Sequence, residues 1–149
     1  GVGRRVTVQL GGTLDKRFTP IELTAEVRMI SDGRFRSESF QAEWYSGRTV
    51  VLQAGNITLV VTSRPVHLYD RSLFHAHGQD PKHFDLVVVK SPHCQPHMFA
   101  DWCAKLINVD APGSTSANLK SLGHTICQRP IFPLDKDVRF EAKADLFAR

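Results

Sequence analysis

The chain has 149 residues, of which 42% are hydrophobic and 23% charged, as is ordinary for a globular protein. A chain of this length can bury the core of one domain without a disulfide framework. It has no run of about 20 apolar residues, which argues against a membrane-spanning helix, and no secretory signal pattern at its start. The formal net charge is +4, but the basic residues are scattered, which argues against a nucleic-acid partner.

Three cysteines, Cys94, Cys103 and Cys127, show no framework of paired spacings. An odd number of widely spaced cysteines is typical of reduced thiols. We therefore expect a cytoplasmic protein, because reduced thiols persist in that compartment.

The first part of the chain, up to residue 63, alternates apolar and polar residues. This two-residue period indicates half-buried strands, which we expect over residues 4–10, 21–30, 34–40, 49–53 and 56–63. Asp32-Gly33 is typical of a tight hairpin turn between the second and third of these strands, and Ala54-Gly55 of a turn between the last two. The pattern predicts a meander of short antiparallel strands.

The pattern changes after Pro65. Asp70 can cap a short helix and Gly78 can end it. Residues 84–90, FDLVVVK, are apolar without alternation, which predicts a strand covered on both faces. We further expect a helix that begins at Pro96, a strand over residues 105–110 and a short helix over residues 116–123.

Two prolines exclude a helix or a central strand from residues 129–135, RPIFPLD. We expect this segment to be extended and to pack on the surface through Ile131, Phe132 and Leu134. Residues 136–149 form a tail that can be helical. The patterns together predict an α+β fold, a mixed and mostly antiparallel β-sheet with a few short helices packed on it, and a domain over residues 1–135 followed by that tail.

Polar and reactive side chains follow the expected strand at 84–90, and they are Lys90, Ser91, His93, Cys94 and His97. A structural zinc site needs paired ligands at a usable spacing, whereas His93 and Cys94 are adjacent and point in different directions. His75 and His77 are expected on or near a helix surface. A thiolate at Cys94 or a Ser91–Lys90 pair lacks the surrounding motif of a known nucleophile.

Lys90 ends an apolar strand in this interpretation, so its ammonium group must reach water or meet an anion. The helix beginning at Pro96 would direct its positive dipole end at the same loop. A carboxylate from a ligand or from a neighbouring domain would be stabilised there. The alternative is an ion pair of Lys90 with Asp110 or Asp135, although for Asp135 we expect a salt bridge to Arg129.

Several segments in order resemble the C-terminal domain of MlrC-like proteins, the microcystinase C family of zinc metallopeptidases. The three most specific are LVVVKSPH (86–93), NVDAPGSTSANLKSLGH (108–124) and RPIFPLD (129–135). QLGGTLD (9–15), DGRF (32–35) and GNITLVVTSR (55–64) fit the same pattern. The resemblance extends to about Asp135.

The resemblance implies a two-domain protein whose larger N-terminal domain carries the zinc ligands and the catalytic acid. It implies no zinc ligand and no catalytic residue in this chain, whose partner is that domain. The family's conserved pieces correspond here to Lys90 and Ser91, to Pro112 and Gly113, and to Arg129, Pro130, Pro133, Leu134 and Asp135. Many relatives have His-Phe-Arg where this sequence has Cys94-Gln95-Pro96, so His93 or His97 would have to substitute.

Two functions are consistent with the sequence. In the first, the chain is an accessory domain of a peptide or amide hydrolase, and Lys90, Ser91, His93 and His97 face the substrate or the interface beside the other domain's zinc. In the second, the chain is a structural or oligomerisation module that forms homo-oligomers and places no residue in the active site. A third hypothesis is a self-sufficient enzyme that uses Cys94 or a local zinc ion.

Overall fold

A computed structural model describes residues 1–12, 18–90, 97–111, 118–139 and 141–142. The chain divides into two compact units, Gly1–Leu106 and Ile107–Arg149. The first unit holds the strands and helices that form a core, and the second holds one short helical turn.

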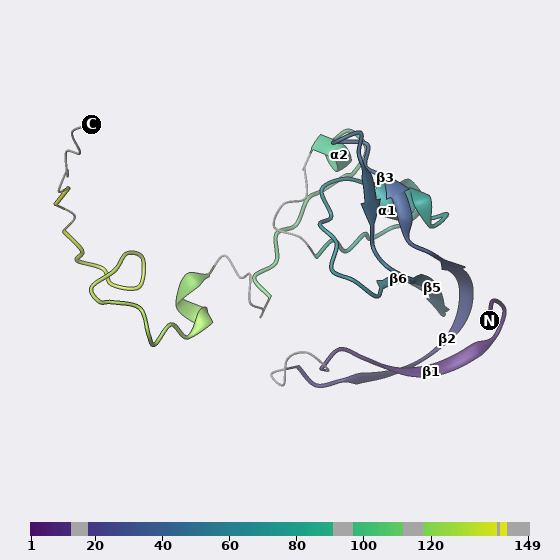
Figure 1. Cartoon of the computed structure of the whole chain (residues 1–149), viewed down its shortest axis with the longest axis horizontal. Coiled ribbons are helices and arrows are strands. Elements are labelled where there is room, and N and C mark those ends of the chain that lie inside the picture. Colours follow the sequence, from purple (N-terminus) through teal and green to yellow (C-terminus); the bar gives the residue numbers. More distant parts are fainter. Residues whose placement is uncertain (13–17, 91–96, 112–117, 140, 143–149) are drawn as a thin grey trace, which may run out of the picture. The chain divides into compact units, whose positions relative to one another are not determined.

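The described strands are β1 (Arg5–Leu10), β2 (Ile21–Ser31), β3 (Arg34–Arg36), β4 (Glu43–Tyr45), β5 (Thr49–Ala54) and β6 (Ile57–Thr62). The helical elements are α1 (Ser72–Ala76), the 3₁₀ turn η1 (Pro81–His83), α2 (His97–Ala100) and the 3₁₀ turn η2 (Leu119–Leu122). Figure 1 shows β1 and β2 as a long curved ribbon, with α1 beside β3. Strands combined with short helices confirm the α+β fold class.

The main sheet has the strand order β1-β2-β5-β6, and its neighbouring strands are antiparallel. The hairpin of β3 and β4 forms a separate antiparallel pair, inserted in the chain between β2 and β5. Val8 lies opposite Leu23 and Leu52 opposite both Val27 and Leu59, so apolar residues face one another across the sheet. A register shift between Val27 and Met29 marks a bulge in β2.

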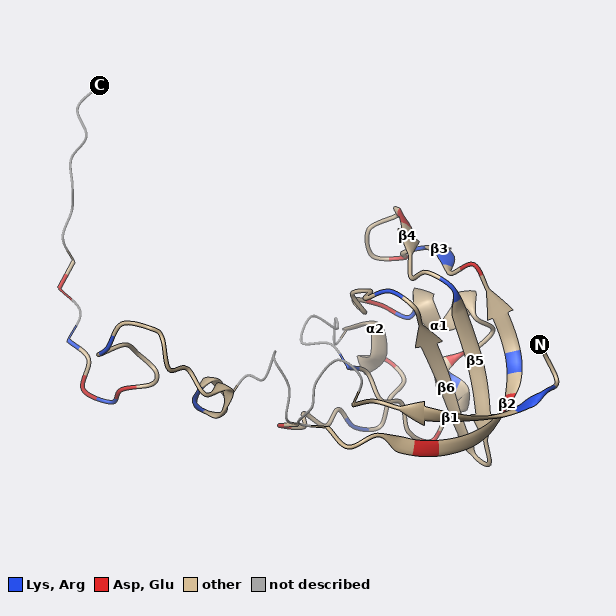
Figure 2. Ribbon diagram, turned by 60° about the horizontal axis from the view of Figure 1, so that its bottom comes forward, with Lys and Arg blue, Asp and Glu red and all other residues tan. Residues whose placement is uncertain are grey.

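The alternating pattern of β2 gives the sheet one apolar and one polar face. Ala25 and Val27 are buried, and together with Leu52 they form the core. The partly buried residues packed against this core are Val6, Val8, Leu23, Val50, Ala54, Leu59 and Val61. On the other face, the hydroxyl groups of Thr7 and Thr24 are hydrogen-bonded at 2.8 Å. Figure 2 shows acidic and basic residues interspersed along β1 and β2.

An aromatic cluster fixes the hairpin of β3 and β4 to the segment that follows β6. The ring of Trp44 lies 5.8 Å from that of Phe40 and 5.6 Å from that of Tyr69. Phe35 extends the cluster, with its ring 6.5 Å from Trp44. Such edge and stacked contacts favour a defined arrangement, which brings the loop after β3 beside Asp70.

One hairpin prediction is confirmed and the other is wrong. Residues Gly55 and Asn56 connect β5 to β6, and Gly55 has a φ of 56°, as a tight hairpin requires. Asp32-Gly33, in contrast, does not fold β3 back onto β2. β2 pairs with β1 and β5, whereas β3 pairs with β4. The bend at Gly33 instead takes the chain out of the main sheet and into the separate pair of β3 and β4. β2 pairs with β5 through long-range contacts, which no local pattern encodes.

The helix expected after Asp70 is confirmed as α1, and Gly78 follows it with a φ of 69°. The strands expected over residues 84–90 and 105–110 are wrong, because both segments are described without any strand pairing. Leu86 and Val88 are 74% and 78% exposed. Among the described residues, therefore, nothing packs over Leu86 and Val88 as a strand buried on both faces would require.

The later helices are shorter than the patterns predicted. α2 has four residues, and Pro96 lies outside the described residues. In the region 116–123, residues 116–117 are not described, and η2 ends at Gly123, whose φ is 64°. Residues 129–135 are not extended, since the Asp135 amide donates to the Ile131 carbonyl at 2.9 Å, and Ile131 and Phe132 are exposed.

The second unit has no buried residue among those that the structure describes. Of the expected C-terminal helix, residues 140 and 143–149 are not described, and residues 137–139 and 141–142 show no helix. The expected domain boundary at residue 135 stays a prediction. Within the described part of the chain, no helix is long and apolar enough to cross a membrane.

Replacing Gly33 with alanine should destabilise the protein strongly. Gly33 has a φ of 76°, and an added Cβ would collide with the carbonyl oxygen of Gly47. We expect a loss of about 3 kcal/mol or more in the free energy of unfolding, measured by urea denaturation. Gly55→Ala is the control, because its φ is also positive but no atom lies within 4 Å of the added Cβ, so it should cost about 1 kcal/mol. Equal losses would contradict the steric explanation.

Candidate functional site

The segment that leads to Lys90 has no regular secondary structure and no backbone partner among the described residues of its unit. Residues 85–90, hereafter the Lys90 segment, follow η1, whose Pro81 is buried. No backbone hydrogen bond to a described residue involves this segment. Exposure alternates along it, since Leu86, Val88 and Lys90 are exposed while Val87 and Val89 are half-buried. Among the described residues of the first unit, Lys90 forms no ion pair.

The remaining residues of the expected loop can be placed only in part. Ser91, His93 and Cys94 lie outside the described residues. His97 is exposed and is the first residue of α2. Because α2 has only four residues, its dipole is small, and the expected contribution of that dipole to anion binding is correspondingly weak. The convergence of these side chains with Lys90 stays a prediction.

α2 is held by apolar packing beyond the expected loop. Phe99 is buried, and its ring lies 5.8 Å from that of Trp102. The indole N–H of Trp102 donates to the Met98 carbonyl at 3.2 Å. The C-terminal end of the loop is therefore anchored.

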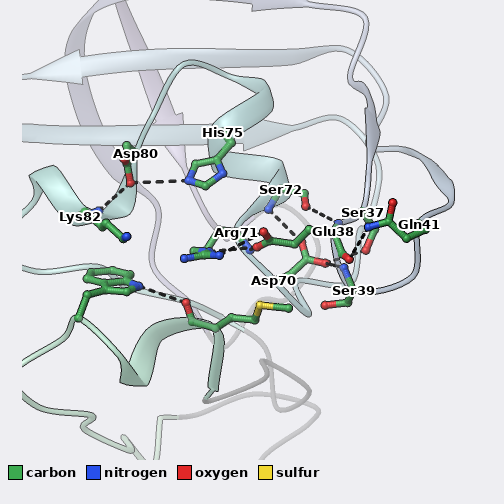
Figure 3. Close-up of polar contacts among 12 residues, drawn as sticks. Ser37, Glu38, Ser39, Gln41, Asp70, Arg71, Ser72, His75, Asp80 and Lys82 are labelled. Carbon is green, nitrogen blue, oxygen red and sulfur yellow. Dashed lines mark hydrogen bonds and ion pairs between the residues drawn. The ribbon is translucent and has the colours of Figure 1, made fainter.

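A buried carboxylate, Asp70, organises the neighbouring loop and the start of α1 (Figure 3). It accepts the Ser37 hydroxyl at 2.6 Å and the Ser39 amide at 2.9 Å on one oxygen, and the Ser72 amide at 2.9 Å on the other. Burial raises the pKa of Asp70, but the hydrogen bonds from Ser37, Ser39 and Ser72 outweigh it and lower the pKa to about 2. The group is ionised at neutral pH and has partners for its charge.

A half-buried ion pair lies next to Asp70. Arg71 donates through Nε and Nη2 to the two carboxylate oxygens of Glu38, at 3.0 and 3.2 Å. The hydrogen bond from Arg71 lowers the pKa of Glu38 and, reciprocally, raises the pKa of Arg71. Asp80 and Asp101 also act on Arg71 electrostatically, which places this cation between the loop after β3 and the end of α2. A bidentate pair of this kind fixes orientation as well as charge.

His77 is buried, not on the helix surface as expected. Its Nδ1 lies 2.6 Å from the Leu73 carbonyl and its Nε2 2.8 Å from the Ser31 hydroxyl. Since a carbonyl only accepts, Nδ1 carries the proton and Nε2 accepts from Ser31. No acid orients the imidazole, so this serine and histidine join β2 to α1 and do not form a catalytic triad. His75, in contrast, is exposed and lies 3.6 Å from Asp80.

The salt bridge expected between Arg129 and Asp135 is confirmed. Two guanidinium nitrogens of Arg129 donate to the two carboxylate oxygens of Asp135, and the Ile131 amide donates to the same carboxylate at 2.7 Å. Pro130 lies inside the loop that these bonds close. Pro112 and Gly113 lie outside the described residues.

The internal acids proposed for Lys90 have other partners. Asp135 is bound by Arg129, and Asp110 accepts from the Asn118 side chain at 3.3 Å. Lys90 belongs to the first unit and both acids to the second, so the alternative of an ion pair between them stays a prediction.

A metal centre cannot be built from the described side chains. Across the ranges that the structure describes, no group of three or more His, Cys, Asp or Glu residues lies in an arrangement that could hold a metal ion. A zinc ion of the usual coordination would need at least three such ligands.

The polar network around Asp70 was not expected from the sequence, apart from the capping position of Asp70 itself. Ser37, Glu38 and Arg71 carry no motif, and they meet only because the aromatic cluster brings two distant segments together. A serine two residues after Asp70 was the one local signal, since it is typical of a carboxylate-capped turn.

The fold and the site define an α+β domain with an apolar segment that has no backbone partner and no ion pair at Lys90 among the described residues of its own unit. Comparison with known proteins identifies the class further. The model of the MlrC C-terminus matches residues 1–125, and the chain belongs to this family. No curated protein matches it.

A crystal structure provides a second comparison. It is that of a putative metallopeptidase from Mesorhizobium sp. BNC1, which is 27% identical, with a TM-score of 0.77. The match covers 95% of this chain and 28% of that chain. The present residues thus correspond to about a quarter of a longer protein.

Replacing Asp70 with asparagine should destabilise the protein in a pH-dependent way. An amide cannot accept all the bonds that the carboxylate accepts, so we expect a loss of about 2 kcal/mol at pH 7 in urea unfolding. Because the folded pKa is lowered from 3.8 to about 2, the carboxylate's contribution is full above pH 3.8 and is lost as the pH falls through about 2. The difference from the unmodified protein should shrink over that window. Asp137→Asn, at an exposed position, is the control and should leave stability unchanged.

Asp135 should titrate abnormally low because of Arg129. The hydrogen bond from Arg129 and that from the Ile131 amide lower the pKa of Asp135 to about 2. NMR titration of the side-chain carboxyl carbon should give a midpoint near that value. In the Arg129→Gln variant the midpoint should rise toward the ordinary value of 3.8. An unchanged midpoint in that variant would show that Arg129 is not the cause.

Proposed function

We propose that this chain is the accessory domain of an MlrC-like zinc metallopeptidase that hydrolyses peptide or amide bonds. The family membership and the similarity to a putative metallopeptidase support this assignment. In the proposal, a domain preceding residue 1 carries the catalytic site, and the Lys90 segment faces its cleft.

One observation carries the role of Lys90. Its side chain is exposed and has no acidic partner among the described residues of the first unit. A long cationic side chain in this position can bind an anionic group of the substrate, such as a carboxylate. Ser91, His93 and His97 are proposed to lie on the same surface.

The described residues do not fit a zinc ligand set, so we place the metal in the preceding domain. There it would supply an activated water for hydrolysis. The residues of this chain are proposed to orient the substrate and to close the cleft against solvent. Cys103 and Cys127 are free thiols, which supports a reducing, cytoplasmic location for the whole protein.

Lys90→Ala in the longer protein should lower kcat/KM by about tenfold or more, because the lost ion pair stabilises the bound substrate. The thermal midpoint should not change, since Lys90 is exposed and has no ion pair with a described residue of the first unit. Lys82→Ala is the matched control, because Lys82 is also exposed and its ammonium group has no ion pair with a described residue. Lys90→Arg should retain most of the activity.

A different outcome would favour the alternative function. If Lys90→Ala leaves turnover normal but lowers the thermal midpoint, the result favours a structural or oligomerisation module. The exposed apolar residues of the Lys90 segment are compatible with that role as well, so kinetic data decide between the two functions.

A further inference from the structure

The Lys90 segment has the composition of a strand, but among the described residues of its unit it lacks a neighbouring strand and an apolar cover on both faces. Leu86, Val87, Val88 and Val89 are consecutive, and three of them are β-branched, as is typical of a strand buried on both faces. In the structure these residues form no strand, and their backbone has no hydrogen-bond partner among the described residues of the first unit. The sequence and the structure are reconciled if the partner lies outside this unit.

The exposure pattern shows which face is incomplete. Val87 and Val89 are half-buried, whereas Leu86 and Val88 are 74% and 78% exposed. One face of the segment therefore already packs on the domain, and the other is open. An occupant must supply both a strand edge for the backbone and an apolar surface for Leu86 and Val88.

The second unit, taken by itself, also exposes apolar side chains. Its described large apolar side chains that are at least 42% exposed are Ile107, Val109, Leu119, Ile126, Ile131 and Phe132. Ile126 is 96% and Phe132 75% exposed. Ile131 and Phe132 lie in the loop that the bonds between Arg129 and Asp135 close. Exposed apolar residues in such number are typical of a surface that another protein segment covers.

We propose that the Lys90 segment is a docking strand that pairs with a sheet edge of the preceding domain in the longer polypeptide. The relative of known structure has about two and a half times as much chain outside the matched part as inside it, since the match covers 28% of its length. This supplies a partner of sufficient size at an effective concentration that no separate molecule reaches. The inference rests on the proposed function in one respect, the presence of that domain.

The pairing gives Lys90 a fixed place. A strand in register with its neighbour holds each side chain at a set position along the edge. Lys90 lies at the end of the segment, on the same alternating set as Leu86 and Val88. When these two side chains are covered by the partner, the ammonium group emerges at the rim of the domain boundary.

Hydrogen exchange of the longer protein tests the pairing. Amides of alternate residues between Leu86 and Lys90 should exchange at least about 100-fold more slowly than those of an unstructured peptide. Exchange at the unstructured rate would overturn the proposal. Protection that disappears on dilution, with a halved molar mass in light scattering, would identify a second copy as the occupant and would overturn it as well.

Val88→Asp in the longer protein should remove that protection, because a carboxylate cannot be buried at the interface without a partner. The matched control is Ile57→Asp, since Ile57 is 59% exposed in β6, and it should leave the exchange of the Lys90 segment unchanged. Equal effects of the two variants, or protection retained in Val88→Asp, would contradict docking through Val88. These outcomes are independent of turnover, so loss of the kinetic effect at Lys90 with intact protection would reject the proposed function and not the docking.

Discussion

An extended backbone is stable in a folded protein only where its peptide groups and its apolar side chains both find partners. The main sheet satisfies this constraint from within, since β1, β2, β5 and β6 pair in order and cover Ala25, Val27 and Leu52. The Lys90 segment has the same composition but does not satisfy it among the described residues. The same requirement thus explains the core of this domain and indicates where the domain is incomplete.

The polar network around Asp70 allows the surface near α2 to be rigid without a large core. One carboxylate receives bonds from a loop that follows β3 and from the start of α1, segments more than thirty positions apart in the chain. Next to it, Glu38 and Arg71 form a bidentate pair whose cation also faces Asp80 and Asp101. The charges of this network are therefore balanced among its own members, whereas Lys90 has no ion pair with a described residue of the first unit.

Local signals predicted the parts of the fold that depend on neighbouring residues. The turn at Gly55, the first strand and the salt bridge between Arg129 and Asp135 follow from short spacings, and all three are confirmed. The pairing of β2 with β5 depends on long-range contacts, so the turn expected at Asp32-Gly33 was wrong. The apolar run before Lys90 was interpreted as a strand buried on both faces, because consecutive apolar residues indicate that a segment is to be buried. The run itself does not indicate which part of the protein packs against it. The burial of His77 escaped prediction for a similar reason, since its partner Ser31 lies 46 positions away.

The open edge of the Lys90 segment has a practical consequence for handling the protein. Consecutive β-branched residues with unpaired peptide groups are a template for intermolecular sheet formation, and native proteins normally protect such edges. Under the docking proposal, a recombinant product that begins near the start of this domain would leave the run from Leu86 to Val89 uncovered. It would tend to precipitate at the concentrations used for crystallisation, whereas coexpression with the proposed preceding domain would keep it in solution.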